Sequence, residues 1–332
     1  MLCLLLLTPG IVEYLSGSSQ LSLLVTFPPL FFAFLGANLA LYGPGALLIR
    51  EAMVRWRKGW GSVLLLGAAY GILEEGVALN TLFYSKANPV GALGYYGHWL
   101  GVNWVWTSQL LIVHALWSIA LPILLLGLAL PETQGRSLLS RRGLGVAFGV
   151  LALDVVVLLL MTGAIYHFYA GPFLLGGAFL GIAALVYAAY RCPRDLLRPS
   201  APYPRRAPWA FFVAGVAMLP GQMLIEDVSM SRHLAPVLAA LGVLGFAALE
   251  LLWVIRNVGE RRHVPQLIAL AGGLIAPLMV LGFVIQIHTG VGLVPVALGD
   301  ASALVFLRFL WRKYAAVPAA PASRLAGLAG IT

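Results

Sequence analysis

The sequence has few charged residues for its length. Only 10% of its 332 residues are Asp, Glu, Lys or Arg, whereas 61% are hydrophobic. An ordinary soluble domain has roughly 25% charged residues. The connections between the apolar stretches are also too short to form a domain with a core of its own. These shortages exclude a soluble enzyme and indicate a chain that folds within a membrane.

Cysteine is scarce as well. The chain has two cysteines, Cys3 and Cys192, and the pattern of apolar stretches predicts them on opposite faces of the membrane. They therefore cannot pair with each other, and one chain offers neither a disulfide nor a thiolate metal site.

Long apolar stretches make up most of the chain. Each has about 20 residues, enough at about 1.5 Å per residue to cross a hydrocarbon layer about 30 Å thick. Repeated Gly, Ala and Leu over such lengths favour bundled helices over a barrel. The sequence therefore predicts an all-α, polytopic transmembrane bundle with nine spans. The predicted spans are 25–49, 60–85, 103–129, 143–166, 171–190, 207–226, 234–255, 264–287 and 290–310.

The basic residues predict the orientation of this bundle. With nine spans, nineteen of the 21 Lys and Arg residues fall on one side. An excess of basic residues marks cytoplasmic loops, so this side and the C-terminus are predicted to be cytoplasmic, in the plasma membrane. The net charge of +9 is then a topology signal, with membrane lipids, including anionic lipid at the basic loops, as partners. We expect no nucleic acid as a partner, because the loops are short and lack interleaved aromatic residues.

The two ends differ from the predicted spans. Residues 1–20 begin with an apolar stretch that has no basic flank and is interrupted at Pro9, unlike a secretory signal peptide. This outer segment is either a short helix that dips into the outer leaflet or a truncated tenth span. Residues 21–314 are predicted to form a single transmembrane domain. The Ala- and Pro-rich residues 315–332 are predicted to form a disordered cytoplasmic tail.

Two adjacent acids, Glu74 and Glu75, lie in the middle of the second predicted span. An ionised side chain there costs several kcal/mol, so each should face the bundle interior, be paired or be protonated. His114 lies at a matching depth in the third span, about 17 Å along the helix from the same end. Because consecutive spans with a short connection are usually neighbours, we expect one of these glutamates to contact His114.

Residue spacing predicts which way these side chains face. Gly67, Gly71 and Glu75 lie four residues apart, on a stripe of small residues that lets a neighbouring helix approach closely. Polar residues also form one stripe on the third span, and further acids and a histidine lie in or near later spans. Further residues predicted to line the site are Tyr70, Asn80, Asn103, Thr107, Ser118, Asp154, Glu226, Asp227, Glu250, His288 and Asp300.

Two stretches resemble a known family. GILEEG followed by LLIVHALWS resembles the paired-glutamate and histidine helices of the CPBP intramembrane endopeptidases. The resemblance implies that Glu74, Glu75 and His114 form a water-activating or metal-binding set. The sequence departs from the family pattern at Leu79, where the family has arginine, and at Ser118, where Asn or Asp is expected. The chain as a whole resembles an uncharacterised bacterial family of polytopic membrane proteins, which implies no activity.

Three functions fit these residues. In a hydrolase, Glu75 is a general base for a water, Glu74 orients the water or shares a proton, and His114 stabilises charge or holds a divalent cation. In a carrier, the same residues bind a proton or cation, and the other membrane acids lie along the path. In a non-catalytic protein that binds lipid or assists assembly, the buried acids are structural.

Overall fold

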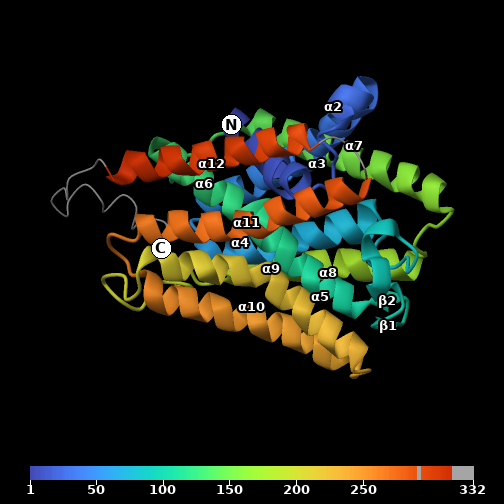
Figure 1. Ribbon diagram of the computed structural model, residues 1–332. Coiled ribbons are helices and arrows are strands. Elements are labelled where there is room, and N and C mark those ends of the chain that lie inside the picture. Colours follow the sequence, from blue (N-terminus) through green and yellow to red (C-terminus); the bar gives the residue numbers. More distant parts are fainter. Residues whose placement is uncertain (290–292, 316–332) are drawn as a thin grey trace.

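Helices form most of the protein in its computed structural model, which describes residues 1–289 and 293–315. Most of them run side by side along one direction (Figure 1). Within these residues, nine helices are long and apolar enough to cross a membrane. The all-α fold and the nine candidate spans agree with the sequence prediction.

The nine candidate spans lie close to their predicted positions. Two of them are built from consecutive helical segments. They are α3 (Pro28–Arg55), α4 (Trp60–Gly71) with η2 (Ile72–Ala78), α5 (Trp104–Val113) with η4 (His114–Ala120) and α6 (Leu121–Ala129), α7 (Arg141–Tyr166), α8 (Pro172–Arg191), α9 (Pro208–Ser231), α10 (Pro236–Val258), α11 (Val264–Thr289) and α12 (Val294–Ala315). The predicted start of the last span at 290 and nearly all of the predicted tail lie outside the described residues.

The second span ends at Ala78, earlier than the predicted residue 85. Asn80 has a φ of 58°, in the left-handed region, which stops the helix. The chain then forms a 3-10 turn, Asn88–Gly94, and a two-stranded hairpin. Its strands, β1 (His98–Trp99) and β2 (Val102–Asn103), pair antiparallel, with His98 opposite Asn103. We call this end of the bundle the hairpin end.

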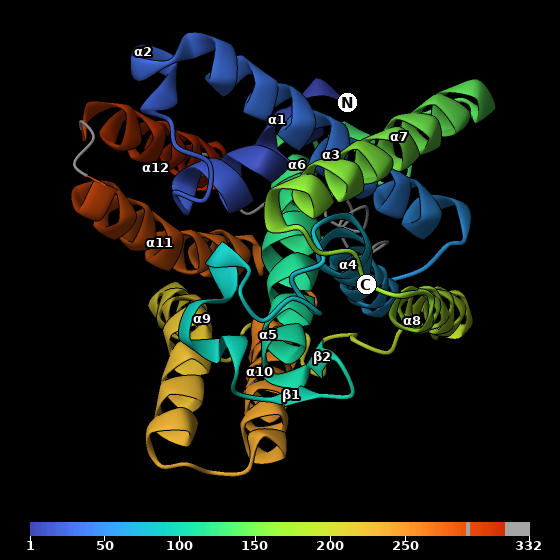
Figure 2. The same ribbon diagram turned by 90° about the vertical axis from the view of Figure 1, so that its right-hand side faces the viewer.

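The second and third spans lie at the centre of the bundle. Seen from the hairpin end, the α5–α6 rod is surrounded by the other helices (Figure 2). In the most apolar stretch of the second span, Trp60–Ala78, 72% of the residues are buried, and in that of the third, Trp104–Ala129, 61% are buried. In α8 the buried share is only 6%. The outer helices thus direct apolar side chains away from the protein, as expected beside lipid. The glutamates and His114 lie on the two most enclosed spans.

Glycines allow the two central spans to touch. A Cβ placed on Gly67 would lie 2.7 Å from the Cα of Ala115, and one on Gly71 would lie 3.1 Å from the Cβ of His114. A side chain at Gly67 would collide with backbone, so this contact requires glycine. The small-residue stripe of the sequence therefore faces the third span, as predicted.

The N-terminal segment packs into the bundle. It consists of α1 (Leu2–Pro9) and η1 (Gly10–Leu15), followed by the short helix α2 (Leu23–Thr26). Leu4 is fully buried. A Cβ on Gly17, just after η1, would lie 2.9 Å from the Cα of Gly282 on α11. The segment is thus held between α3 and α11, close to the central spans.

Candidate functional site

Three π-helical segments in the described residues carry the polar centre of the protein. Glu13 lies in η1, Glu74 and Glu75 lie in η2, and His114 with Ser118 lies in η4. The wide turn of η2 closes with a bond from the Leu79 N–H to the Glu74 carbonyl, five residues back. A wider turn reduces the angle between consecutive side chains, so both glutamates can face one partner. Short π-helical insertions occur often at functional sites.

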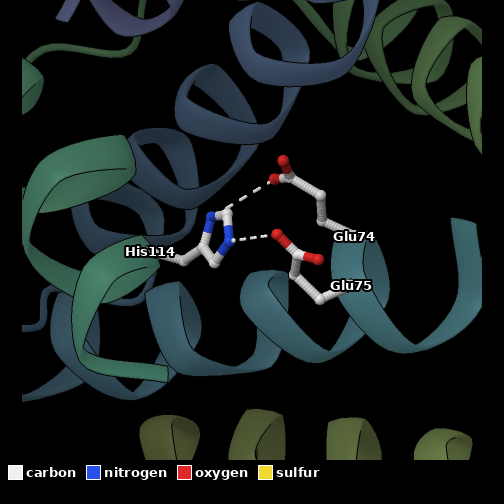
Figure 3. A group of neighbouring side chains, drawn as sticks. All are labelled: Glu74, Glu75 and His114. Atoms are coloured by element: carbon white, nitrogen blue, oxygen red, sulfur yellow. Dashed lines mark hydrogen bonds and ion pairs between the residues drawn. The ribbon is translucent and has the colours of Figure 1, made fainter. Parts of the chain in front are cut away.

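The imidazole of His114 lies between the two carboxylates (Figure 3). Its Nδ1 is 3.3 Å from Oε2 of Glu74, and its Nε2 is 3.3 Å from Oε1 of Glu75. Nδ1 also lies 3.0 Å from the Ser118 hydroxyl. The exposed fractions of Glu74, Glu75 and His114 are 1%, 8% and 2%. The predicted contact between the two central spans is therefore present, and both glutamates take part.

Tyr42 extends this cluster to the N-terminal segment. Its hydroxyl donates to Oε1 of Glu13 at 2.7 Å and also lies within hydrogen-bond distance of Oε1 of Glu74. A tyrosine has one hydroxyl proton and can donate to only one of them at a time. The contact with the second carboxyl is favourable when that carboxyl carries a proton and donates to the Tyr42 oxygen. The arrangement therefore favours a proton held by Glu13 or Glu74.

Charge balance leads to the same conclusion. Glu13, Glu74 and Glu75 lie together with one imidazole, and among the described residues no Lys or Arg forms an ion pair with any of them. Unpaired buried carboxylates cost several kcal/mol each. Three ionised acids cannot be balanced by one imidazolium. The cluster is therefore built to hold protons, or a bound cation, in the interior.

Other side chains fix the orientation of the central three. The Thr81 hydroxyl donates to Oε2 of Glu75, and the Trp106 indole N–H donates to the Thr81 oxygen at 3.3 Å. The Tyr70 ring meets the His114 ring edge-on, with centroids 6.0 Å apart. Each oxygen of Glu75 thus has a partner, whereas Oε2 of Glu74 is buried without a hydrogen bond.

A cavity of about 440 Å³ reaches the cluster from the hairpin end. Both Glu75 and His114 line it, together with Glu13, Tyr42 and Glu226. Glu226 lies on α9, is buried, and has an Oε1 atom with no hydrogen-bond partner in the described part of the chain. We call this space the hairpin-end cavity.

Three residues predicted to line the site form hydrogen bonds outside it. Asn103 caps α5 by accepting from the Trp106 N–H, and Thr107 donates to the Asn103 carbonyl. Asn80 accepts from the Ala170 N–H at 3.2 Å, which ties the end of η2 to the start of α8. All three are buried, but these hydrogen bonds lie away from His114. Of the predicted polar stripe on the third span, Ser118 alone bonds to the histidine.

The more distant acids are not brought to the cluster. Asp154 on α7 and Asp300 on α12 are buried, and each has a carboxylate oxygen without a hydrogen bond in the described chain. Glu250 on α10 is half-buried, and its carboxylate oxygens also have no hydrogen bond in the described chain. Asp227 is exposed and lines the hairpin-end cavity. His288 lies in the last turn of α11, and its side chain is outside the described part, so its role stays a prediction.

Sequence reasoning missed Glu13, Tyr42 and Thr81. Glu13 has a visible signal, since it is an acid in an otherwise apolar N-terminal segment. Tyr42 and Thr81 have none, because a tyrosine or threonine in an apolar helix or loop is ordinary. Their importance depends on the contact between segments that are distant in the sequence.

The cluster has the donor set of a divalent cation site. One atom each from Glu74, Glu75 and His114 lie within 4.8 Å of one another. Carboxylate oxygen and imidazole nitrogen suit zinc and other first-row metals. Oε2 of Glu74 accepts no hydrogen bond in the described chain and lies 3.3 Å from Nδ1 of His114, so it is available as a ligand. Each ring nitrogen, however, faces a different carboxylate, and this arrangement suits protons shared between the imidazole and the two carboxylates equally well.

Comparison of the chain with protein-family models, curated proteins and solved structures finds no match.

Proposed function

We propose that the protein is a membrane-embedded hydrolase that cleaves a peptide or lipid bond presented through the hairpin-end cavity. The observation that supports it best is that Glu75 and His114, in contact at 3.3 Å, both line that cavity. A buried carboxylate beside an imidazole, with room for a substrate and a water, is the arrangement of a general base and its partner.

The roles follow from the contacts. Glu75 takes a proton from a water in the cavity, since its carboxylate lies at the wall and is held by Thr81 and His114. His114 stabilises the negative charge that develops on the attacked group. Glu74 holds the other side of the imidazole. Tyr42 joins Glu74 to Glu13, so a proton can leave the centre without crossing lipid.

A divalent cation fits the same residues. Glu74, Glu75 and His114 would hold it, and the chemistry it would supply is a lowered pKa for a bound water.

A proton-coupled carrier is the second candidate. It is favoured by one observation, the chain of contacts from Glu13 through Tyr42, Glu74 and His114 to Glu75, which links five groups able to exchange protons. A carrier also needs access from both faces. A cavity at the opposite end of the bundle shares no lining residue with the hairpin-end cavity.

The test uses the full chain in vesicles made from the phospholipids and membrane proteins of an expression host. Products are measured as new peptide termini and lysolipids by mass spectrometry, and proton flux is measured with a dye inside the vesicles. Glu75→Gln keeps the size of the side chain and removes its basicity. Glu132→Gln is the control with the same substitution, since Glu132 is exposed on the connection between α6 and α7, outside the cluster.

Loss of products in Glu75→Gln but not in the control variant supports the hydrolase. Loss of proton flux in Glu75→Gln but not in the control variant supports the carrier. Wild-type protein that forms no product and carries no flux contradicts both. A Glu75→Gln protein that differs from wild type only in its melting temperature assigns the acids a structural role.

A further inference from the structure

A second cavity lies at the end of the bundle opposite the hairpin. The α5–α6 rod begins at the hairpin and ends at this cavity, which we call the basic-end cavity. Its volume is about 230 Å³, the share of roughly seven water molecules. It is lined by five side chains that are or can be cationic, and by no Asp or Glu of the described chain. The five are Arg50, Arg57, Lys58, Arg194 and His263.

Only part of this positive charge is balanced. Arg50 pairs with Glu51 at 2.9 Å and also donates to the carbonyl of Arg136. Arg57 and Lys58 form no ion pair within residues 1–289 and 293–315. The Lys58 ammonium donates to the Cys192 carbonyl at 3.0 Å, which leaves two of its three protons available. The cavity therefore has a surplus of positive charge and of donors.

His263 provides an independent sign that a ligand belongs here. It lines the cavity and is only 9% exposed, yet its Nδ1 has no hydrogen-bond partner in the described chain. Burial lowers the pKa of its imidazole, against a backbone contact with Glu260 that raises it. The unprotonated nitrogen of a neutral imidazole accepts a hydrogen bond from a donor such as a P–OH group. A buried polar atom without a partner is costly, and a bound group would satisfy it.

Helix ends add to the positive potential. The N-termini of α4, at Trp60, and of α11, at Val264, both line the cavity, and the N-terminal end of a helix attracts anions. The carbonyls at the C-terminal end of α6 would oppose this, but they are already bonded. Lys313 donates to the Ala129 carbonyl at 2.7 Å, and Gln134 donates to the Gly127 carbonyl at 2.9 Å.

We propose that the basic-end cavity binds a phosphate group, supplied by a lipid with a phosphomonoester headgroup, such as phosphatidic acid, or by free inorganic phosphate. Guanidinium and ammonium groups donate charge-assisted hydrogen bonds to phosphate oxygens, and Nδ1 of His263 accepts from a P–OH group. The basic end is the end that the sequence predicts to be cytoplasmic, the side on which a membrane carries its anionic lipids. This inference does not depend on the proposed hydrolase, because the two cavities have separate linings.

Two measurements on the full chain test it and distinguish the sources. Native mass spectrometry counts phosphatidic acid retained from a mixture with equal phosphatidylcholine. Calorimetry follows inorganic phosphate titrated into protein in nanodiscs of phosphatidylcholine alone. Arg57→Ala and His263→Asn each remove one group of the cavity. Arg261→Ala is the control, since Arg261 is an exposed arginine at the same end that does not line the cavity.

We expect Arg57→Ala to weaken binding about tenfold, the effect of losing one charge-assisted hydrogen bond, and Arg261→Ala to leave it unchanged. Because Arg57 is exposed, its variant tests the inference even if His263→Asn does not fold. Retention of phosphatidic acid identifies the lipid as the source, and a calorimetric signal identifies free phosphate. Binding of neither probe, or equal binding by Arg57→Ala and wild type, overturns the proposal.

Discussion

Glu13 and Tyr42 form a hydrogen bond of 2.7 Å although 29 positions separate them in the sequence. The bond joins the short N-terminal segment to α3, the first long helix of the bundle. The same hydroxyl lies within hydrogen-bond distance of Glu74. The N-terminal segment therefore contributes an acid to the centre of the protein, and its removal would open the cluster.

Tyr42→Phe tests the shared proton directly. The change leaves the ring in place but removes the hydroxyl between the Glu13 and Glu74 carboxyls, so the Oε1 atom of each loses this partner. We expect a loss of about 1 to 3 kcal/mol in the free energy of unfolding, the cost of an unsatisfied buried polar group, and a lower melting temperature in detergent. Tyr187→Phe, on the exposed face of α8, is the control and should melt like wild type. Equal melting of the two variants would mean that the bridge contributes nothing.

Glu13→Gln separates a role in proton transfer from a role in folding. The amide oxygen can still accept from Tyr42, so we expect the melting temperature to change little. The amide cannot exchange a carboxyl proton, so the rate of product formation or of proton flux should fall about tenfold or more, within the usual contribution of general acid–base groups. Ser19→Ala is the comparison, since it removes the hydroxyl that donates to Glu13 at 2.8 Å but keeps the acid. An unchanged rate in Glu13→Gln would remove Glu13 from the proton pathway.

The contact between the paired acids and His114 is predictable because it rests on regular geometry. Two helices of known rise, joined by a short connection, place residues at equal depth beside each other. The small-residue stripe ending at Glu75 then predicts the facing side. The nine candidate spans are predictable for the same reason, since length and apolarity are visible in the sequence.

The remainder of the site depends on features that leave no repeating pattern of residues in the sequence. The π-helical turns that bring Glu74 and Glu75 to one side arise from packing, and their residues look like ordinary helix. Tyr42 meets Glu13 only because the N-terminal segment folds back between α3 and α11. Asn103 is a polar residue on the predicted stripe, yet its side chain caps a helix, because the helix start needed an acceptor.

Gly67→Ala tests the packing that brings the two central spans together. The new Cβ would lie 2.7 Å from the Cα of Ala115, a backbone atom that cannot turn aside. We expect a loss of about 1 to 3 kcal/mol, typical of overpacking, and weaker contact between the acids and the imidazole. Gly176→Ala on α8 is the matched control, since nothing lies within 4 Å of its Cβ. In a helix alanine is favoured over glycine by up to about 1 kcal/mol, so this control should melt at or above wild type. Melting of Gly67→Ala at the wild-type temperature would show that the helices can separate at no cost.

Glu51 at the basic end holds the connection between α6 and α7 to α3. It is fully buried and pairs with Arg50 at 2.9 Å and with Arg55 at 3.1 Å. It also accepts from the Ser137 hydroxyl and from the Leu138 N–H at 2.6 Å. Both oxygens of this carboxylate therefore have partners, and each oxygen has one positively charged partner.

Glu51→Gln leaves the buried Arg50 guanidinium without its counter-charge, and breaking a buried pair from one side costs about 3 to 5 kcal/mol. Glu260→Gln is the control, because the Arg198–Glu260 pair is more exposed and an exposed pair contributes about 0 to 1 kcal/mol. The measurement is the melting temperature of each variant in the same detergent, together with proteolysis of the α6–α7 connection. We expect Glu51→Gln alone to melt early and to be cut faster between Pro131 and Ser140. A Glu51→Gln protein as stable as the control would mean that solvent compensates Arg50, and that the connection is held by its other contacts.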